Sequence, residues 1–163
     1  MRKTFFILSA LILSGFMLTS LGTPDAKPVV TSSTTATAAD TLSWKLLGQI
    51  KYVKKPSKDY PEGVMFPVIN PTLKSKSKKQ IVMSGFIIPI DNKNYALSKN
   101  VFASCFFCGQ AGPETIMGIK FKNPNMKLKT DQYVTLQGTF RYNDDDVNDW
   151  IYHIENAVIV KGN

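Results

Sequence analysis

The chain has 163 residues, a hydrophobic fraction of 44% and a formal net charge of +8. This length is enough for one modest core and excludes two domains of ordinary size. Most lysines are spread along the chain, so the charge favours solubility over a dedicated surface for anionic lipid, polysaccharide or an acidic partner. No cysteine precedes Cys105, which excludes lipid attachment to an amino-terminal cysteine.

The first residues are typical of an export signal. Arg2 and Lys3 precede residues 4–21, which are nearly all apolar or small. The two charges hold the amino end in the cytoplasm while the apolar run enters the membrane. We predict a signal peptide over residues 1–26, or an uncleaved anchor, since the apolar run is just long enough to span a bilayer. The protein is therefore expected in the periplasm or the extracellular space, and at the membrane only through an uncleaved leader.

The segment after the leader is compositionally different from the rest of the chain. Residues 23–40 are rich in Ser, Thr, Ala and Pro and contain almost no large apolar side chains. Such a segment cannot bury enough surface to offset its ordering entropy. We predict a disordered linker over residues 27–41 and a folded domain over residues 42–161.

Several stretches of this domain have the composition of β-strands, and none after residue 40 has sustained helical periodicity. The strongest are residues 81–90, which are β-branched and aromatic, and residues 133–142, which alternate with period two. Turn-forming residues separate the stretches. The expected strands, in chain order, are residues 44–50, 81–90, 95–97 with 101–103, 115–121, 133–142 and 150–160.

Two glycines lie in the middle of expected strands. At Gly85 and Gly138 a small barrel would have to bend sharply, and a side chain would crowd the neighbouring strand. Five or six short strands with interior glycines predict an all-β fold, a small OB-like Greek-key barrel, with a β-sandwich as the alternative. OB barrels often bind single-stranded nucleic acid, but export would place this one away from it, so we expect no nucleic-acid partner.

Distinctive chemistry is confined to residues 104–114. Cys105 and Cys108 are the only two cysteines of the chain and are separated by two residues. At this spacing two thiols can approach one metal ion, or each other. Three interpretations follow, and the spacing does not choose between them.

The first interpretation is a transition-metal site. Thiolates bind Zn²⁺ and Cu(I) strongly, but a closed zinc site needs four ligands. Glu114 lies in the same glycine-rich loop as Cys105 and Cys108, and His153, the only histidine, lies in the last expected strand. These four residues form one site only if the barrel brings the last strand beside the loop. Two chains sharing four thiolates are another solution.

The other interpretations are a structural or partner-binding module with a Cys105–Cys108 disulfide, and a thiol–disulfide oxidoreductase. Export favours oxidation, although a bridge over so short a loop adds only about 2 kcal/mol to stability. A catalytic cysteine pair usually opens a helix, whose amino end stabilises the thiolate. Here Gly109, Gly112 and Pro113 follow the pair, and these residues do not continue a helix.

Three segments together resemble a known group of proteins. Residues 85–90 (GFIIPI), residues 105–114 (CFFCGQAGPE) and residues 134–139 (VTLQGT) are similar to an exported bacterial family of largely uncharacterised OB-like proteins. The resemblance covers residues 42–161 and is most specific at residues 105–114. It implies an OB-like fold, a link to metal handling or transport at the envelope, and an envelope protein or transport complex as partner. It implies no catalytic residues, so we expect a non-enzymatic protein.

Overall fold

The structure, a computed structural model, describes residues 39–105, 108–109 and 111–162. All of them belong to one compact unit, Ala36–Asn163. The predicted signal peptide over residues 1–26, and the predicted linker as far as residue 38, lie outside the described residues. Within the described part of the chain, no helix is long and apolar enough to cross a membrane.

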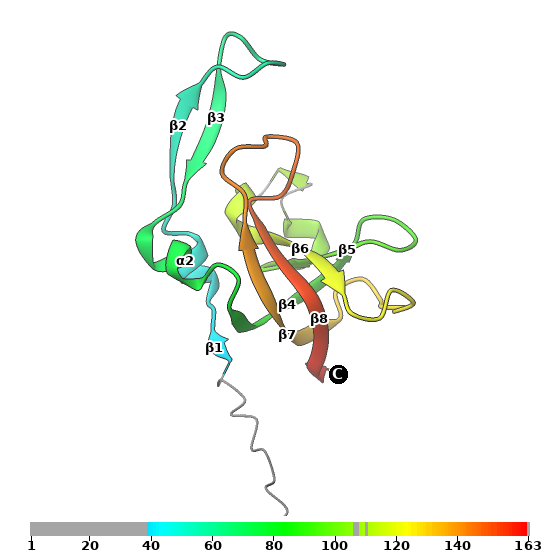
Figure 1. Ribbon diagram of the computed structural model, residues 1–163. Helices are drawn as coiled ribbons and strands as arrows, with labels where there is room; N and C mark the ends of the chain where they lie inside the picture. The colour runs from blue at the N-terminus through cyan, green and yellow to red at the C-terminus, as the bar shows by residue number, and fades with distance from the viewer. Residues whose placement is uncertain (1–38, 106–107, 110, 163) are drawn as a thin grey trace, which may run out of the picture. The chain divides into compact units, whose positions relative to one another are not determined.

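The described chain is mostly β-structure with two short α-helices and short 3-10 turns (Figure 1). The ordered domain begins slightly before its predicted boundary, because two residues assigned to the linker form β1. The elements are β1 (Asp40–Thr41), α1 (Trp44–Leu47), β2 (Lys51–Lys55), β3 (Val64–Val68), α2 (Pro71–Lys76), β4 (Gln80–Pro89), β5 (Tyr95–Ser98), η1 (Phe102–Ser104), η3 (Pro113–Thr115), β6 (Ile116–Phe121), β7 (Tyr133–Tyr142) and β8 (Tyr152–Gly162).

Five strands close into a barrel. Their order is β4-β5-β6-β8-β7, and β7 pairs with β4 to complete the ring. β6 and β8 run parallel, whereas the other neighbours are antiparallel. The prediction of an all-β, OB-like Greek-key barrel is therefore confirmed. The β-sandwich alternative is wrong, because a single sheet closes on itself.

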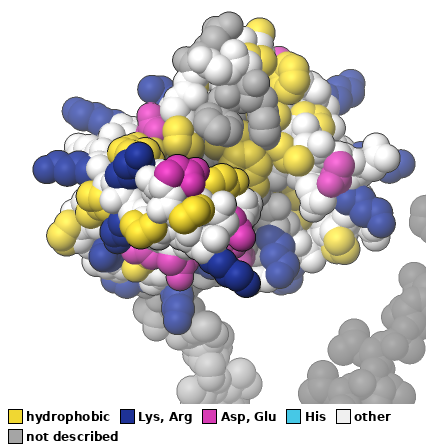
Figure 2. All heavy atoms as spheres, turned by 90° about the horizontal axis from the view of Figure 1, so that it is seen from above, with side chains coloured by type: hydrophobic (Ala, Val, Ile, Leu, Met, Phe, Trp, Pro, Cys, Tyr) yellow, Lys and Arg dark blue, Asp and Glu magenta, His cyan; other side chains and the backbone are white. Residues whose placement is uncertain are grey.

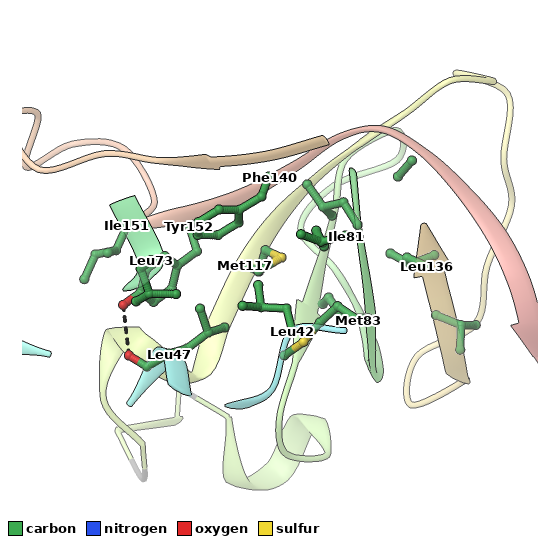
Figure 3. Close-up of a cluster of buried hydrophobic side chains, with 14 of the residues drawn as sticks. Leu42, Leu47, Leu73, Ile81, Met83, Met117, Leu136, Phe140, Ile151 and Tyr152 are labelled. Atoms are coloured by element: carbon green, nitrogen blue, oxygen red, sulfur yellow. Dashed lines mark hydrogen bonds between the residues drawn. The ribbon is translucent and has the colours of Figure 1, made fainter. Parts of the chain in front are cut away.

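The barrel core follows from the alternation of buried and exposed side chains along two long strands, β4 and β7. β4 and β7 point every second side chain inward over most of their length, as the period-two pattern predicts. The inward positions carry large apolar side chains, which Figure 3 shows meeting between the strands. The inward-facing buried residues are Ile81, Met83 and Ile87 on β4, and Val134, Leu136 and Phe140 on β7.

The segment before the barrel contributes to the same core. Leu47 at the end of α1 and Leu73 in α2 are fully buried in the cluster that contains the barrel side chains. Tyr152 of β8 donates a hydrogen bond from its hydroxyl to the Leu47 carbonyl, 2.9 Å away (Figure 3). The predicted strand at residues 44–50 is wrong: Ser43 caps a helical turn there by accepting a hydrogen bond from the Leu46 amide.

β2 and β3 form a separate antiparallel hairpin that the sequence did not predict. Three of the five β2 residues are lysines, and most side chains of the hairpin are exposed. Their sequences do not alternate between apolar and polar residues, so no period-two pattern predicted these strands. Lysine and arginine side chains are also spread around the face shown in Figure 2 rather than gathered in one patch, which agrees with the interpretation of the charge as solubilising.

The two mid-strand glycines lie where strands approach closely. A Cβ on Gly85 would lie 2.6 Å from the Ser98 carbonyl oxygen, and one on Gly138 would lie 2.7 Å from the Glu155 carbonyl oxygen. The β7–β8 register also shifts between Gln137 and Thr139, which marks a bulge. The expected crowding by a neighbouring strand is therefore present at both glycines.

Candidate functional site

The cysteine loop follows β5 and is shaped by successive tight turns. The Cys105 amide donates to the Phe102 carbonyl and the Cys108 amide donates to the Cys105 carbonyl, both at 3.1 Å. The loop is fixed to the strand-connecting segment before β7, because the Phe102 amide donates to Oδ1 of Asp131 at 2.7 Å. Main-chain hydrogen bonds therefore set the positions of both cysteines. Residues 101–103, predicted as strand, instead enter the 3-10 turn η1.

The structure brings the two cysteines together without joining them. Both thiols are free, and the two residues approach each other to 4.2 Å. Cys105 is buried and Cys108 is exposed. The Cys108 thiol donates to the Phe102 carbonyl at 3.2 Å. One sulfur therefore faces the protein interior while the other is accessible from solvent.

The surroundings of Cys108 favour its protonated form. Partial desolvation raises the pKa of the Cys108 thiol, and the adjacent Cys105 raises it further through a side-chain hydrogen bond and its charge. An attacking thiol in a redox enzyme needs a lowered pKa. This environment therefore does not favour the thiol–disulfide oxidoreductase interpretation.

Glu114, the third predicted ligand, is engaged elsewhere. It lies in η3, and its Oε2 accepts a hydrogen bond from the Tyr52 hydroxyl of β2 at 3.1 Å. Burial raises the pKa of Tyr52, and the Glu114 charge and hydrogen bond raise it further. Burial also raises the pKa of Tyr152, and the nearby Tyr52 and Glu114 add to this shift. Glu114 thus ties the end of the cysteine loop to the β2–β3 hairpin.

His153, the fourth predicted ligand, belongs to a different cluster. Its Nε2 lies 2.9 Å from the Trp150 carbonyl oxygen and 3.1 Å from Oδ2 of Asp149. Burial lowers the pKa of His153, and the Arg141 charge lowers it further. The ring is therefore neutral near pH 7 and donates its Nε2 proton to these two acceptors.

The four predicted ligands are not gathered into one site. Across residues 39–105, 108–109 and 111–162, no three His, Cys, Asp or Glu side chains are placed to hold one metal ion together. The structure unites Cys105 with Cys108 and bonds Glu114 and His153 to other partners. Sequence reasoning missed Tyr52, the partner of Glu114, because 62 positions separate the two residues and no local pattern connects them.

The unequal exposure of the two thiols predicts unequal reactivity. In the native protein we expect iodoacetamide to modify Cys108 about tenfold or more faster than Cys105, since alkylation requires an accessible thiolate. Cys105→Ala and Cys108→Ala isolate the two thiols, and mass spectrometry over time measures each rate. Unfolding in urea should make the two rates similar. Equal rates in the native state would contradict the burial of Cys105.

Fold and site together define an OB-like barrel that carries two neighbouring, unbonded thiols. No protein-family model matches the sequence, and no curated protein matches it. Among solved structures, the chain is similar to a DUF3299 family protein from Pseudomonas aeruginosa, with 13% sequence identity and a TM-score of 0.48. That match covers 77% of this chain and 95% of the other, and we infer no function from it.

Proposed function

We propose that this protein is an exported, non-enzymatic envelope protein that captures a transition-metal ion, Zn²⁺ or Cu(I), through Cys105 and Cys108. The observation that carries the proposal is that the two cysteines approach to 4.2 Å without forming a disulfide. A Zn–S bond is about 2.3 Å long, so two cysteines that approach this closely can both reach a single ion. Soft thiolates select these two metals over hard cations.

The different exposure of the two thiols supports capture rather than a purely structural role. Cys108 is exposed and offers a first ligand to an ion arriving from solvent. Cys105 is buried beside it and offers a second ligand in surroundings from which water is largely excluded. Both main-chain amides are hydrogen-bonded within the loop, which keeps the two side chains near each other.

On Zn²⁺, two protein thiolates leave coordination positions open. Cu(I) accepts two sulfur ligands, whereas a closed zinc site requires four. Glu114 and His153 would have to leave Tyr52 and Asp149 before they joined. The remaining ligands are more simply supplied by a second copy of the loop or by an envelope partner. An open site of this kind suits an ion that is taken up and passed on.

Metal titration of the reduced full chain tests the proposal. With a competing chromophoric chelator and no oxygen, we expect one Zn²⁺ or Cu(I) per chain, or one per two chains where four thiolates are shared. Cys105→Ser and Cys108→Ser should each weaken binding by about hundredfold or more, because each removes one of two protein ligands. Glu114→Gln and His153→Gln are matched controls and should leave the affinity unchanged.

A metal stoichiometry near zero that neither serine substitution alters would contradict metal capture. The alternative with a specific observation behind it is a disulfide-locked module, since the proximity of the cysteines also suits oxidation. Mass spectrometry of the protein as isolated from the envelope separates the two functions. Loss of two hydrogen atoms, with no metal bound after reduction, would favour the disulfide.

A further inference from the structure

A pocket with a mixed polar and apolar lining lies on the outside of the barrel, apart from the cysteine loop. Its volume is ≈ 380 Å³, which falls within the range of small-molecule sites. β6, β7 and β8 form its floor, and its rim includes the β4–β5 turn and the loop that precedes β8. None of its lining residues belongs to residues 101–115, so it is separate from the proposed metal site.

The strand register aligns the residues of the pocket floor side by side on the outer face of the barrel. His153 of β8 pairs with Gly118 of β6 on one side and with Arg141 of β7 on the other. Two positions further along, Glu155 pairs with Lys120. Because side chains two positions apart on a strand share a face, all five residues point outward, opposite the barrel core.

The Arg141 guanidinium of the pocket is paired with two carboxylates. Arg141 donates from Nε to Oε1 of Glu155 at 3.0 Å and from Nη2 to Oδ2 of Asp149 at 3.2 Å. The lining itself carries two cations, Lys120 and Arg141, and one anion, Glu155. Asp149, which is not part of the lining, supplies a second anion through its contacts with Arg141 and His153. With Asp149 included, the charges in and beside the pocket balance, so they offer no general attraction to phosphate or to nucleic acid. The pocket presents fixed hydrogen-bond donors and acceptors side by side.

Two rings lie close to the floor because Gly118 has no side chain. A Cβ on Gly118 would lie 2.8 Å from Cδ1 of Trp150 and 3.0 Å from Nδ1 of His153. Since Nε2 of His153 carries the ring proton toward Asp149 and Trp150, Nδ1 is a hydrogen-bond acceptor. Trp150 and Tyr95 add aromatic surface to the lining. The pocket thus combines aromatic walls with donors and acceptors of both kinds.

We propose that this pocket binds one or two rings of an uncharged carbohydrate. Sugar hydroxyls donate and accept hydrogen bonds, so they match paired planar groups such as the Arg141 guanidinium and the Glu155 carboxylate. Their apolar ring faces pack against aromatic side chains such as Trp150. The rim agrees with this class of ligand, because OB barrels bind oligosaccharides with the loops that correspond to the β4–β5 turn and the loop before β8. The floor lies beside the face of β5 and β6, the second and third barrel strands, which those barrels use.

Titration of the full chain with the N-acetylglucosamine trimer, maltotriose and cellotriose tests the proposal by amide NMR and calorimetry. We expect at least one of them to shift the signals of Gly118, Arg141 and His153 and the Trp150 indole N–H. Trp150→Ala and Lys120→Met should each weaken binding by about tenfold or more. Lys99→Met, an exposed lysine outside the pocket, is the matched control and should bind normally.

Lys120→Met keeps the test valid if Trp150→Ala fails to fold, because Lys120 is exposed. Cys105→Ser should bind the sugar normally, which separates this site from metal capture. No signal change in the pocket with any of the three sugars would overturn the proposal. Tighter binding of a galacturonic acid trimer or of a thymidine oligonucleotide would also overturn it, because either result requires a positively charged pocket.

Discussion

Leu47→Ala is expected to lower the free energy of unfolding by about 2–5 kcal/mol, the cost of removing a buried leucine from a well-packed cluster. Leu47 has no exposed surface and shares its cluster with the barrel side chains. Its carbonyl also accepts the Tyr152 hydroxyl, so a shift of α1 would disturb a buried hydrogen bond. Urea denaturation followed by tryptophan fluorescence measures the change.

Lys45→Ala is the matched control, because Lys45 is an exposed residue of the same helical turn. Its substitution should change the free energy of unfolding by no more than about 0.5 kcal/mol. A similar, small effect of both substitutions would mean that α1 is not part of the cooperative fold. A large effect of Leu47→Ala alone would show that the segment before β4 completes the barrel core.

The two long barrel strands β4 and β7 could be predicted because their burial alternates. Residues 81–90 and 133–142 were expected as strands, and the structure has them at Gln80–Pro89 and Tyr133–Tyr142. Each buries one face and leaves the other partly exposed, so the period-two signal is written into the sequence. The glycines inside these strands, Gly85 and Gly138, further indicated that the sheet closes into a barrel.

The segment between the linker and β4 could not be predicted in the same way. α1 has four residues, too few for a helical period to appear. It is stabilised by the Ser43 cap and by burial of Leu47, and only the first of these is local. β2 and β3 are largely exposed, so nothing in their sequence required alternation. Residues 101–103 were predicted as a strand but enter the 3-10 turn η1. The position of η1 depends on the carboxylate of Asp131, which is distant in sequence.

In the candidate site, too, a contact between residues close in sequence could be predicted, whereas contacts that depend on the folded barrel could not. The spacing of Cys105 and Cys108 was enough to predict that they lie together, because four consecutive residues can form one tight turn. The positions of Glu114 and His153 depend on how the barrel closes. Glu114 meets Tyr52 of the hairpin, and His153 meets Asp149 of the preceding loop. Neither contact could be inferred from the residue types alone.

Gly138→Ala is expected to lower the free energy of unfolding by about 1–3 kcal/mol, the usual cost of overpacking a core. The new Cβ would lie 2.7 Å from the Glu155 carbonyl oxygen and 3.1 Å from the Ala157 Cα. Both are main-chain atoms of β8, so no flexible side chain can move away to make room. β8 would have to separate from β7 at the bulge where their register already shifts. The midpoint of urea denaturation, compared with the native protein, measures the loss.

Gly48→Ala is a suitable control for the same glycine-to-alanine change without crowding. Gly48 ends α1 with φ −70, and the nearest atom to an added Cβ is the Trp44 carbonyl oxygen at 3.4 Å. This substitution should be neutral or stabilise by up to about 1 kcal/mol, because alanine restricts the unfolded chain more than glycine does. If Gly138→Ala were equally harmless, β8 would be free to move outward, and the close approach of β7 and β8 would not be what requires glycine at position 138.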